Sequence, residues 1–278
     1  MGLDVGARGG WRTARSAALA GIAFVVLAAL DPGRAAAEAG PCAAPLDHAH
    51  AAWTGLLRRY VSAGAVDYGS WKSGGAADLD RYLKGLHGVC RSQHDGWTRD
   101  QKLAYWINLY NATTIDLVLD AHPTPSIMEI GGSRGAVFKL KVIPLRALRG
   151  ESLSLDDVEN AVIRPQFREP RVHFALVCAA KSCPRLRAEA FRADVLERQL
   201  DEQTRDFVRD PRANRYDARA GTLRLSRIFE WYADDFRQGG GTVASFVARY
   251  LGGEAAAAVA ARPPRLEYLE YDWSLNGR

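Results

Sequence analysis

The chain has 278 residues and a formal net charge of +5, with 37 basic and 32 acidic side chains dispersed along it. Because no run of lysine or arginine occurs, the composition argues against a nucleic-acid partner. A chain of this length buries a substantial core without metal or disulfide staples. We therefore expect one domain, and the sequence indicates neither a bound metal nor a cofactor.

The N-terminus has the pattern of a secretory signal. Three arginines in the first 15 residues precede an apolar run over residues 17–30, and small residues follow at 35–39. This order of basic, apolar and small residues is typical of a cleavable signal peptide. The apolar run is shorter than the roughly 20 residues that cross a bilayer. We predict that residues 1–39 are a signal peptide, that no membrane span remains after its removal, and that the protein is periplasmic or secreted.

Helices and strands are expected to interleave along the rest of the chain. Helices are predicted over residues 51–62, 79–86, 99–121, 154–163 and 194–208 and after Ser226 and Thr242, and strands over 65–68, 136–143, 172–177, 215–225 (a hairpin) and 265–271. Because no βαβ rhythm occurs, we predict an α+β fold: one compact domain with a central, mainly antiparallel or mixed sheet packed by helices. Its parts are a helical extension (40–96), a core (97–208) and a C-terminal extension packing on the core (209–278).

The clearest element is the helix over residues 99–121. Thr98 and Gln101 form a capping-box pattern at its start, and Pro123 stops the chain soon after its end. Asn111 lies at the edge of its apolar stripe. A buried amide must find hydrogen-bond partners, so we expect Asn111 to tie the helix to a neighbouring loop.

Several polar and aromatic pairs have two interpretations. His48 and His50 could bind a metal but lack a third ligand, so an ordinary surface pair is the simpler interpretation. Asp234 and Asp235 are predicted to form a solvated helix face. The aromatic pairs Trp231-Tyr232 and Tyr271/Trp273 are expected to pack against the core, with an exposed ligand platform as the alternative.

Reactive groups concentrate between His173 and Pro184. Cys183 is predicted to lie at the N-terminus of a helix that begins with Pro184, where exposed N–H groups favour a thiolate. Lys181 adds positive charge nearby. His173 is the candidate base on the preceding strand, with a buried core histidine as the alternative.

A histidine base also needs a group that orients it. Glu159 on the preceding helix is the first candidate, and Asn108 and Asn111 are alternatives.

The four cysteines permit two disulfides in an exported protein. Cys42 and Cys90 lie outside the reactive segment, so a structural bond between them is expected. Cys178 and Cys183 are close enough in sequence for a short-loop disulfide, which competes with a nucleophilic role for Cys183.

Four separated motifs carry a family resemblance. They are residues 101–112 (QKLAYWINLYNA), 154–159 (SLDDVE), 171–184 (the His-strand and its two cysteines) and 271–276 (YDWSLN). In this order they resemble the bacterial domain-of-unknown-function family 547. The similarity covers residues 97–208 most closely, with flanking similarity reaching Asn276.

The resemblance implies an α+β domain, often exported, and no established substrate. Its marked positions in this chain are Asn108, Tyr110, Asn111, Glu159, His173, Cys178, Cys183 and Pro184. Two positions depart from the family pattern: Val177 stands where asparagine is frequent, and Asn160 where histidine is frequent.

Two functions from different classes follow. The first is a non-catalytic envelope module that binds a partner or ligand, with Cys178–Cys183 as a structural disulfide and Asn108, Tyr110, Asn111, Cys178 and Lys181 as candidate binding residues. The second is a cysteine-dependent hydrolase or acyl/amide transferase that acts on peptide or peptidoglycan-like amides. In it, Cys183 would be the nucleophile, His173 the base and Glu159 the orienting group.

Overall fold

A computed structural model describes residue 42 and residues 44–278. The predicted signal peptide lies outside these residues. Within the described part of the chain, no helix is both long and apolar enough to cross a membrane.

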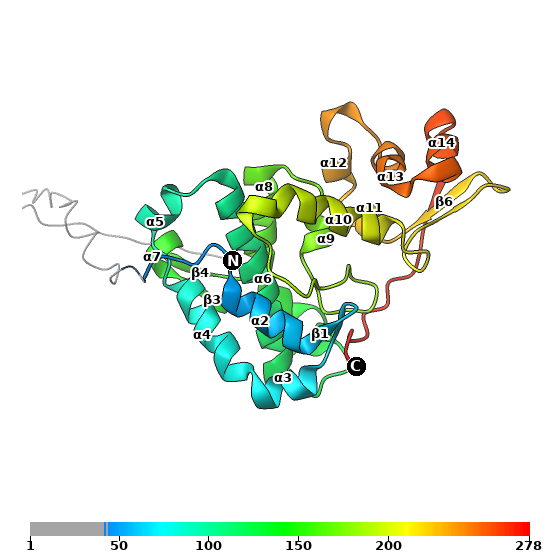
Figure 1. Ribbon diagram of the computed structural model, residues 1–278. Helices are drawn as coiled ribbons and strands as arrows, with labels where there is room; N and C mark the ends of the chain where they lie inside the picture. Colours follow the sequence, from blue (N-terminus) through cyan, green and yellow to red (C-terminus); the bar gives the residue numbers. More distant parts are fainter. Residues whose placement is uncertain (1–41, 43) are drawn as a thin grey trace, which may run out of the picture. The chain divides into compact units, whose positions relative to one another are not determined.

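The first half of the described chain is built around one long helix. Its elements are α2 (Ala51–Tyr60), β1 (Val61–Ser62), β2 (Ala65–Val66), α3 (Tyr68–Gly74), α4 (Ala76–His87), α5 (Arg91–Asp95), α6 (Arg99–Ala121), the 3₁₀ turns η1 (Ile127–Glu129) and η2 (Ala136–Lys139), β3 (Ile143–Leu145), α7 (Arg146–Arg149) and β4 (Glu151–Leu153). Helix α6 packs against α3, α4 and later elements that form the site (Figure 1).

The second half carries the candidate site and a smaller helical cluster. Its elements are the π-helix η3 (Asp157–Ile163), α8 (Arg164–Phe167), α9 (Val172–Ala175), η4 (Ala193–Val195), α10 (Leu196–Val208), β5 (Arg215–Asp217), β6 (Thr222–Leu225), α11 (Ile228–Trp231), α12 (Ala233–Phe236), η5 (Gln238–Gly240), α13 (Val243–Leu251), α14 (Gly253–Ala261) and β7 (Arg265–Tyr268).

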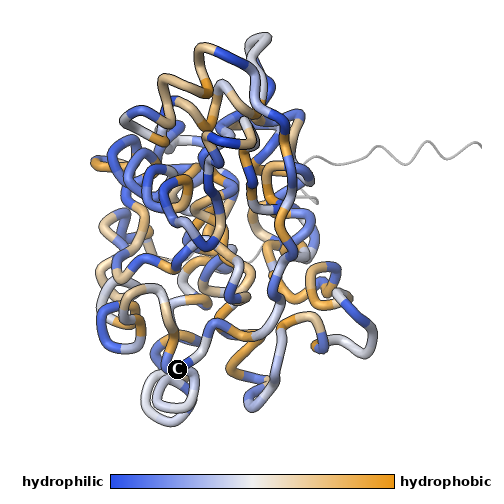
Figure 2. The backbone as a smooth tube through the Cα atoms, turned by 90° about the vertical axis from the view of Figure 1, so that its right-hand side faces the viewer, coloured by the Kyte–Doolittle hydropathy of each residue, from blue (hydrophilic) through white to orange (hydrophobic). Residues whose placement is uncertain are grey.

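The predicted helix over 99–121 is confirmed with both of its ends. Thr98 Oγ1 accepts a hydrogen bond from the Gln101 N–H, and Gln101 Oε1 accepts one from the Thr98 N–H. This reciprocal cap satisfies two backbone donors that the first helical turn leaves free. Short apolar and hydrophilic stretches alternate along the tube in Figure 2, as expected for amphipathic elements around a shared core.

The α+β class is confirmed, although the strands of the described residues form three small sheets rather than one central sheet. Two are antiparallel pairs, β1–β2 and β3–β4. The third has the order β5–β6–β7, with β5–β6 antiparallel, as the hairpin prediction expected, and β6–β7 parallel.

The strand predicted over 136–143 is wrong. Gly135 adopts the left-handed conformation (φ 77°) and starts the 3₁₀ turn η2, so strand β3 begins only at Ile143. The alternating apolar residues were read with a period of two, but one turn of 3₁₀ helix buries Val137 equally well.

The strand predicted over 172–177 is also wrong, because residues Val172–Ala175 form the short helix α9. The segment lies between two hydrophobic clusters. Val172 and Ala175 join the larger cluster around α6, while Phe174 joins the smaller one formed with α10–α14 and β6. Because the segment is apolar on every face, its sequence carries no period that separates strand from helix.

The helix predicted to start at Pro184 does not form, since residues 183–192 lack regular secondary structure. The capped helix after Ser154 does form, and Ser154 and Asp157 bond each other's backbone N–H groups. Most of it is the π-helix η3, and Pro165 lies in the first turn of α8 instead of ending the helix. Proline is accommodated there because the first turn has no need of its N–H.

Cys42 and Cys90 form the expected disulfide, which fastens the start of the described chain to the N-terminus of α5. At the other end, the segment after β7 runs back across the domain (Figure 1). The Asn276 N–H donates to Ala179 O, and the Arg278 N–H donates to Val66 O. This C-terminal segment therefore fixes the loop that carries the two remaining cysteines.

Candidate functional site

Six of the eight positions marked by the family resemblance line one pocket of about 350 Å³. They are Tyr110, Glu159, His173, Cys178, Cys183 and Pro184. They come from α6, η3, α9 and the loop that follows α9. The pocket has a polar floor and an aromatic wall, which is the usual composition of a small-molecule site.

His173 is held between two carboxylates. Its Nε2 lies 2.7 Å from Asp235 Oδ2 and its Nδ1 lies 3.8 Å from Glu159 Oε1. The imidazole also stacks on the Tyr232 ring, with 3.8 Å between centroids. Because both ring nitrogens face carboxylates, neither is directed at a cysteine, and the geometry does not form the Cys183–His173 pair.

Asp235 is a site residue that the sequence interpretation missed. It was expected to be solvated, yet it bonds His173 and also accepts hydrogen bonds from both Nε and Nη2 of Arg164. Burial alone would raise its pKa, but the hydrogen bonds from His173 and Arg164 hold the pKa of Asp235 at about 2. No local sequence pattern indicates that Arg164 and Asp235, which are 71 positions apart, form a pair.

Glu159 is the buried carboxylate of the pocket floor. The Tyr110 hydroxyl donates to Glu159 Oε2 at 3.5 Å, and the Tyr232 hydroxyl is a second hydrogen-bonding neighbour. Burial raises the pKa of both tyrosines, and Glu159 raises each further. The two hydroxyls therefore keep their protons and remain donors. Glu159 lies in a π-helical turn, a distortion often found at functional sites.

Cys178 has the environment of a thiolate. Its Sγ lies 3.2 Å from Tyr271 Oη. The hydrogen bond from the Cys183 thiol does most to lower the pKa of Cys178; burial opposes this effect, and the Tyr271 hydroxyl and Ala180 N–H lower the pKa further. Donors aimed at a sulfur stabilise its negative charge.

Cys183 has the opposite environment. Burial raises its pKa, and the neighbouring Cys178 raises it further. Its Sγ accepts a hydrogen bond from the Cys178 N–H at 2.9 Å. Both cysteines are free, so the short-loop disulfide is not formed in this structure. The thiolate predicted for Cys183 from the exposed N–H groups of a helix N-terminus is also wrong in its premise, because no helix begins at Pro184.

The backbone around these sulfurs is constrained. Ala179 has φ 56°, a left-handed conformation that costs an alanine about 1–2 kcal/mol. This turn brings the Ala180 N–H back to Cys178. Such strain persists only where surrounding contacts impose it. Here the C-terminal segment does so, since the Lys181 N–H donates to Ser274 O and the Asn276 N–H to Ala179 O.

Three aromatic rings form one wall of the pocket. Tyr271 lies 4.7 Å from Trp273 and 4.9 Å from Trp231 between ring centroids, and the two indoles are 5.9 Å apart. The Trp231 residue is 46% exposed, although tryptophan usually packs inside. The platform interpretation of these residues therefore fits better than complete packing against the core.

Asn108 and Asn111 line no part of this pocket and hold backbone instead. Asn108 bonds both the N–H and the carbonyl of Phe191. Asn111 accepts from the Val177 N–H and donates to Ala175 O, so the expected tie from α6 to a neighbouring segment is confirmed. Their buried amides position the segments on either side of the site.

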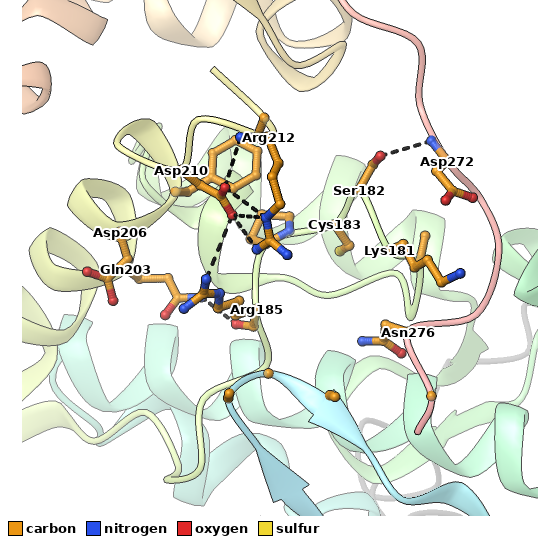
Figure 3. Close-up of a pocket in the computed structure, with 18 residues that line it drawn as sticks. Lys181, Ser182, Cys183, Arg185, Gln203, Asp206, Asp210, Arg212, Asp272 and Asn276 are labelled. Atoms are coloured by element: carbon orange, nitrogen blue, oxygen red, sulfur yellow. Dashed lines mark hydrogen bonds and ion pairs between the residues drawn. The ribbon is translucent and has the colours of Figure 1, made fainter. Parts of the chain in front are cut away.

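Lys181 faces a second pocket of about 490 Å³ on the other side of the cysteine loop (Figure 3). Arg212 and Arg185 both lie against Asp210 there, and the Ser182 hydroxyl accepts from the Asp272 N–H. The acidic and basic groups of this pocket largely neutralise one another. Cys183 also lines this second pocket, whereas Cys178 does not.

The remaining candidate ligands lie elsewhere. His50 Nδ1 is 2.8 Å from the Tyr82 hydroxyl, and His48 packs edge-on against Trp97. Among the described residues, no group of three or more histidine, cysteine or acidic side chains is arranged to hold a metal.

The polar floor and the paired thiols come from residues 110–183, and the aromatic wall comes from Trp231, Tyr271 and Trp273, much later in the chain. No curated protein and no solved structure matches the sequence. Residues 94–208 match the model of one protein family, and this region contributes Tyr110, Glu159, His173 and both free cysteines. That family is described as "Protein of unknown function, DUF547", and the similarity covers this part of the chain.

Proposed function

We propose that this protein is an exported binding module whose aromatic-walled pocket takes a small amide-bearing ligand, such as a peptide or amino-sugar fragment of the cell envelope. The observation that carries the proposal is the exposed Trp231 ring beside Tyr271 and Trp273, above a floor of buried polar groups. An apolar wall with a few convergent polar groups suits a compact ligand.

The aromatic wall favours a ligand with a flat apolar face. An exposed indole has a large apolar surface and loses little conformational freedom when a ligand packs on it. Phe138 extends this wall, with its ring 6.3 Å from Trp273. A ring or a short peptide would cover the surface of Trp231 that is now exposed.

The floor favours a hydrogen-bond donor on the same ligand. Glu159 is buried, and its only neighbouring donors among the described contacts are tyrosine hydroxyls and the more distant His173. A carboxylate retains acceptor capacity beyond these contacts. An amide N–H of the ligand would supply the missing donor, whereas a purely apolar ligand would leave this capacity unused.

Two features support export. The first is the leader pattern of residues 1–39, and the second is the Cys42–Cys90 disulfide, a bond that persists mainly in oxidising compartments. N-terminal sequencing of the protein recovered from the cell envelope would test export. We expect a mature chain that begins near residue 40, and an intact Met1 would contradict it.

Tryptophan fluorescence tests the binding proposal directly. We expect muramyl dipeptide or N-acetylglucosamine to produce a saturable change in emission. Trp231→Ala should weaken binding at least about tenfold, because buried tryptophans dominate such contacts, while Trp231→Phe should retain part of the affinity.

Val142→Ala is the matched control. Among the residues that the structure describes, Val142 is the other exposed large apolar side chain, at 42%, and it does not line the pocket. Its substitution should leave affinity unchanged. An equal loss in both alanine variants, or no saturable change with either ligand, would contradict the proposed site.

A further inference from the structure

We propose that Cys178, and not Cys183, is a nucleophile that accepts an acyl group from a ligand bound in the aromatic-walled pocket. The inference adds an activity to the proposed binding site and rests on that site only for the position of the ligand. Its carrying observation is the position of Cys178 in that pocket, with its Sγ 3.2 Å from Tyr271 Oη, whereas Cys183 Sγ accepts the Cys178 N–H.

Three donors converge on Cys178 Sγ. They are the Tyr271 hydroxyl at 3.2 Å, the backbone N–H of Ala180 and the thiol of Cys183. Burial of the Tyr271 hydroxyl raises its pKa and keeps it a donor, although the residue as a whole is half-buried. A sulfur with three donors can exist as thiolate, the form that attacks carbonyl carbon.

Cys183 is arranged to serve Cys178. It receives the Cys178 N–H at 2.9 Å and stays protonated, because burial raises its pKa. Its S–H is therefore available to the neighbouring sulfur. Three titratable groups face Cys178 and shift its pKa: Cys183 and Tyr271 lower it, which favours the thiolate, and Glu159 raises it.

This arrangement removes the need for a histidine base. Both nitrogens of His173 face carboxylates, so His173 orients the acidic side of the pocket. A thiolate formed before the ligand arrives does not need a base at the moment of attack. Cys178 also lines the pocket that we propose holds the ligand.

The reaction is acyl transfer. The thiolate attacks the carbonyl carbon of an ester, thioester or activated amide, a C–S bond forms, and the bond from carbonyl to leaving group breaks. The leaving group takes a proton from water, which balances the proton that Cys178 released to solvent when its thiolate formed. Water then cleaves the thioester, which yields a carboxylic acid and restores the thiol, so the sequence requires no oxidant or reductant.

Acylation by p-nitrophenyl acetate tests the inference. The purified protein, with its native Cys42–Cys90 bond, would be treated at pH 7, quenched in acid and mapped by peptide mass spectrometry. We expect a hydroxylamine-sensitive acetyl group on Cys178. Cys178→Ser should abolish this adduct, and Tyr271→Phe should slow its formation about tenfold, because one donor to the thiolate is lost.

Lys181→Ala is the control, since Lys181 faces the second pocket, and it should be acetylated on Cys178 at the wild-type rate. An acetyl group on Cys183, or on lysines alone while Cys178 stays free, would overturn the inference. The wild-type map is sufficient for this result if a cysteine variant fails to fold.

The outcomes also separate the two proposals. A protein that binds muramyl dipeptide but never acetylates Cys178 contradicts the nucleophile and leaves the binding site intact. A protein that acetylates Cys178 while Trp231→Ala has no effect on ligand binding supports the nucleophile and contradicts the binding proposal.

Discussion

Asp234 and Asp235 are neighbours in sequence with opposite environments. The Asp235 side chain is 18% exposed and bonds both His173 and Arg164, whereas the Asp234 side chain is 94% exposed. Removing one member of a buried charge network leaves its partners without compensation. The two residues therefore form a matched pair for testing the network.

Asp235→Asn should lower the free energy of unfolding by about 2 kcal/mol at pH 7. Asp234→Asn should change it by less than about 0.5 kcal/mol. The contribution of Asp235 is present above its ordinary pKa, near 4, and is lost as pH falls towards its folded-state pKa of about 2. Urea unfolding of both variants measures the difference, and equal effects would contradict the network.

The sequence predicted which side chains are reactive, but it did not predict which residues they pair with. One pocket contains Glu159, His173 and both free cysteines, which the sequence singles out because reactive side chains cluster visibly along it. Their roles depend on Asp235 and Tyr271, which come from distant segments. The preference for Cys183 rested on a helix that does not form.

Elements with strong local signals were predicted well. Helix α6 has a capping box, a long apolar stripe and a following proline, and its predicted bounds are those observed. The segment that became α9 is short and apolar throughout. Its conformation depends on the two hydrophobic clusters that it separates. The residues of these clusters lie far away in sequence, so the local sequence does not predict the helix.

Thr98→Ala should lower the free energy of unfolding by about 1 kcal/mol, the usual value of a side-chain cap. Thr98 Oγ1 accepts the Gln101 N–H, and alanine would leave that donor to water. Thr98→Ser keeps the hydroxyl and should stay within about 0.5 kcal/mol of the wild type. Chemical denaturation measures both, and equal losses would show that the cap is not the cause.

The described molecule has a larger core around α6 and a smaller cluster formed with α10–α14 and β6, with Phe174 of α9 packed into the latter. The C-terminal segment spans them and reaches the cysteine loop. Chain length predicted a substantial core, and the order of the predicted helices and strands predicted an α+β class. It could not predict the division into three small sheets, because the pairing of such short strands is decided by the helices around them.

Stability should fall in mild acid. Burial lowers the pKa of His50 and of His87 to about 4, whereas unfolded histidines titrate near 6.5. Between these values the unfolded chain binds more protons, so the free energy of unfolding decreases as pH falls from about 7 to about 4. The loss reaches about 3 kcal/mol for His50, which is almost fully buried.

Urea midpoints measured from pH 7 to pH 4 at constant ionic strength would test this expectation. His87→Gln should give a shallower decline, because one of the two titrations is removed. Burial raises the pKa of Asp116 to about 6, which acts in the opposite direction in both proteins, so the comparison of the two declines carries the test. Equal declines in the wild type and in His87→Gln would contradict the burial of a neutral histidine at position 87.

The most direct test of the whole account is the rate at which iodoacetamide labels each free cysteine of the native protein between pH 5 and pH 9. We predict that Cys178 is labelled first, because its pKa is lowered, and that Cys183 is labelled slowly at every pH, because its pKa is raised. As the pH is lowered, the labelling rate of Cys178 should begin to fall at a lower pH than that of an ordinary thiol. Faster labelling of Cys183, or equal rates with the profile of an ordinary thiol, would contradict it.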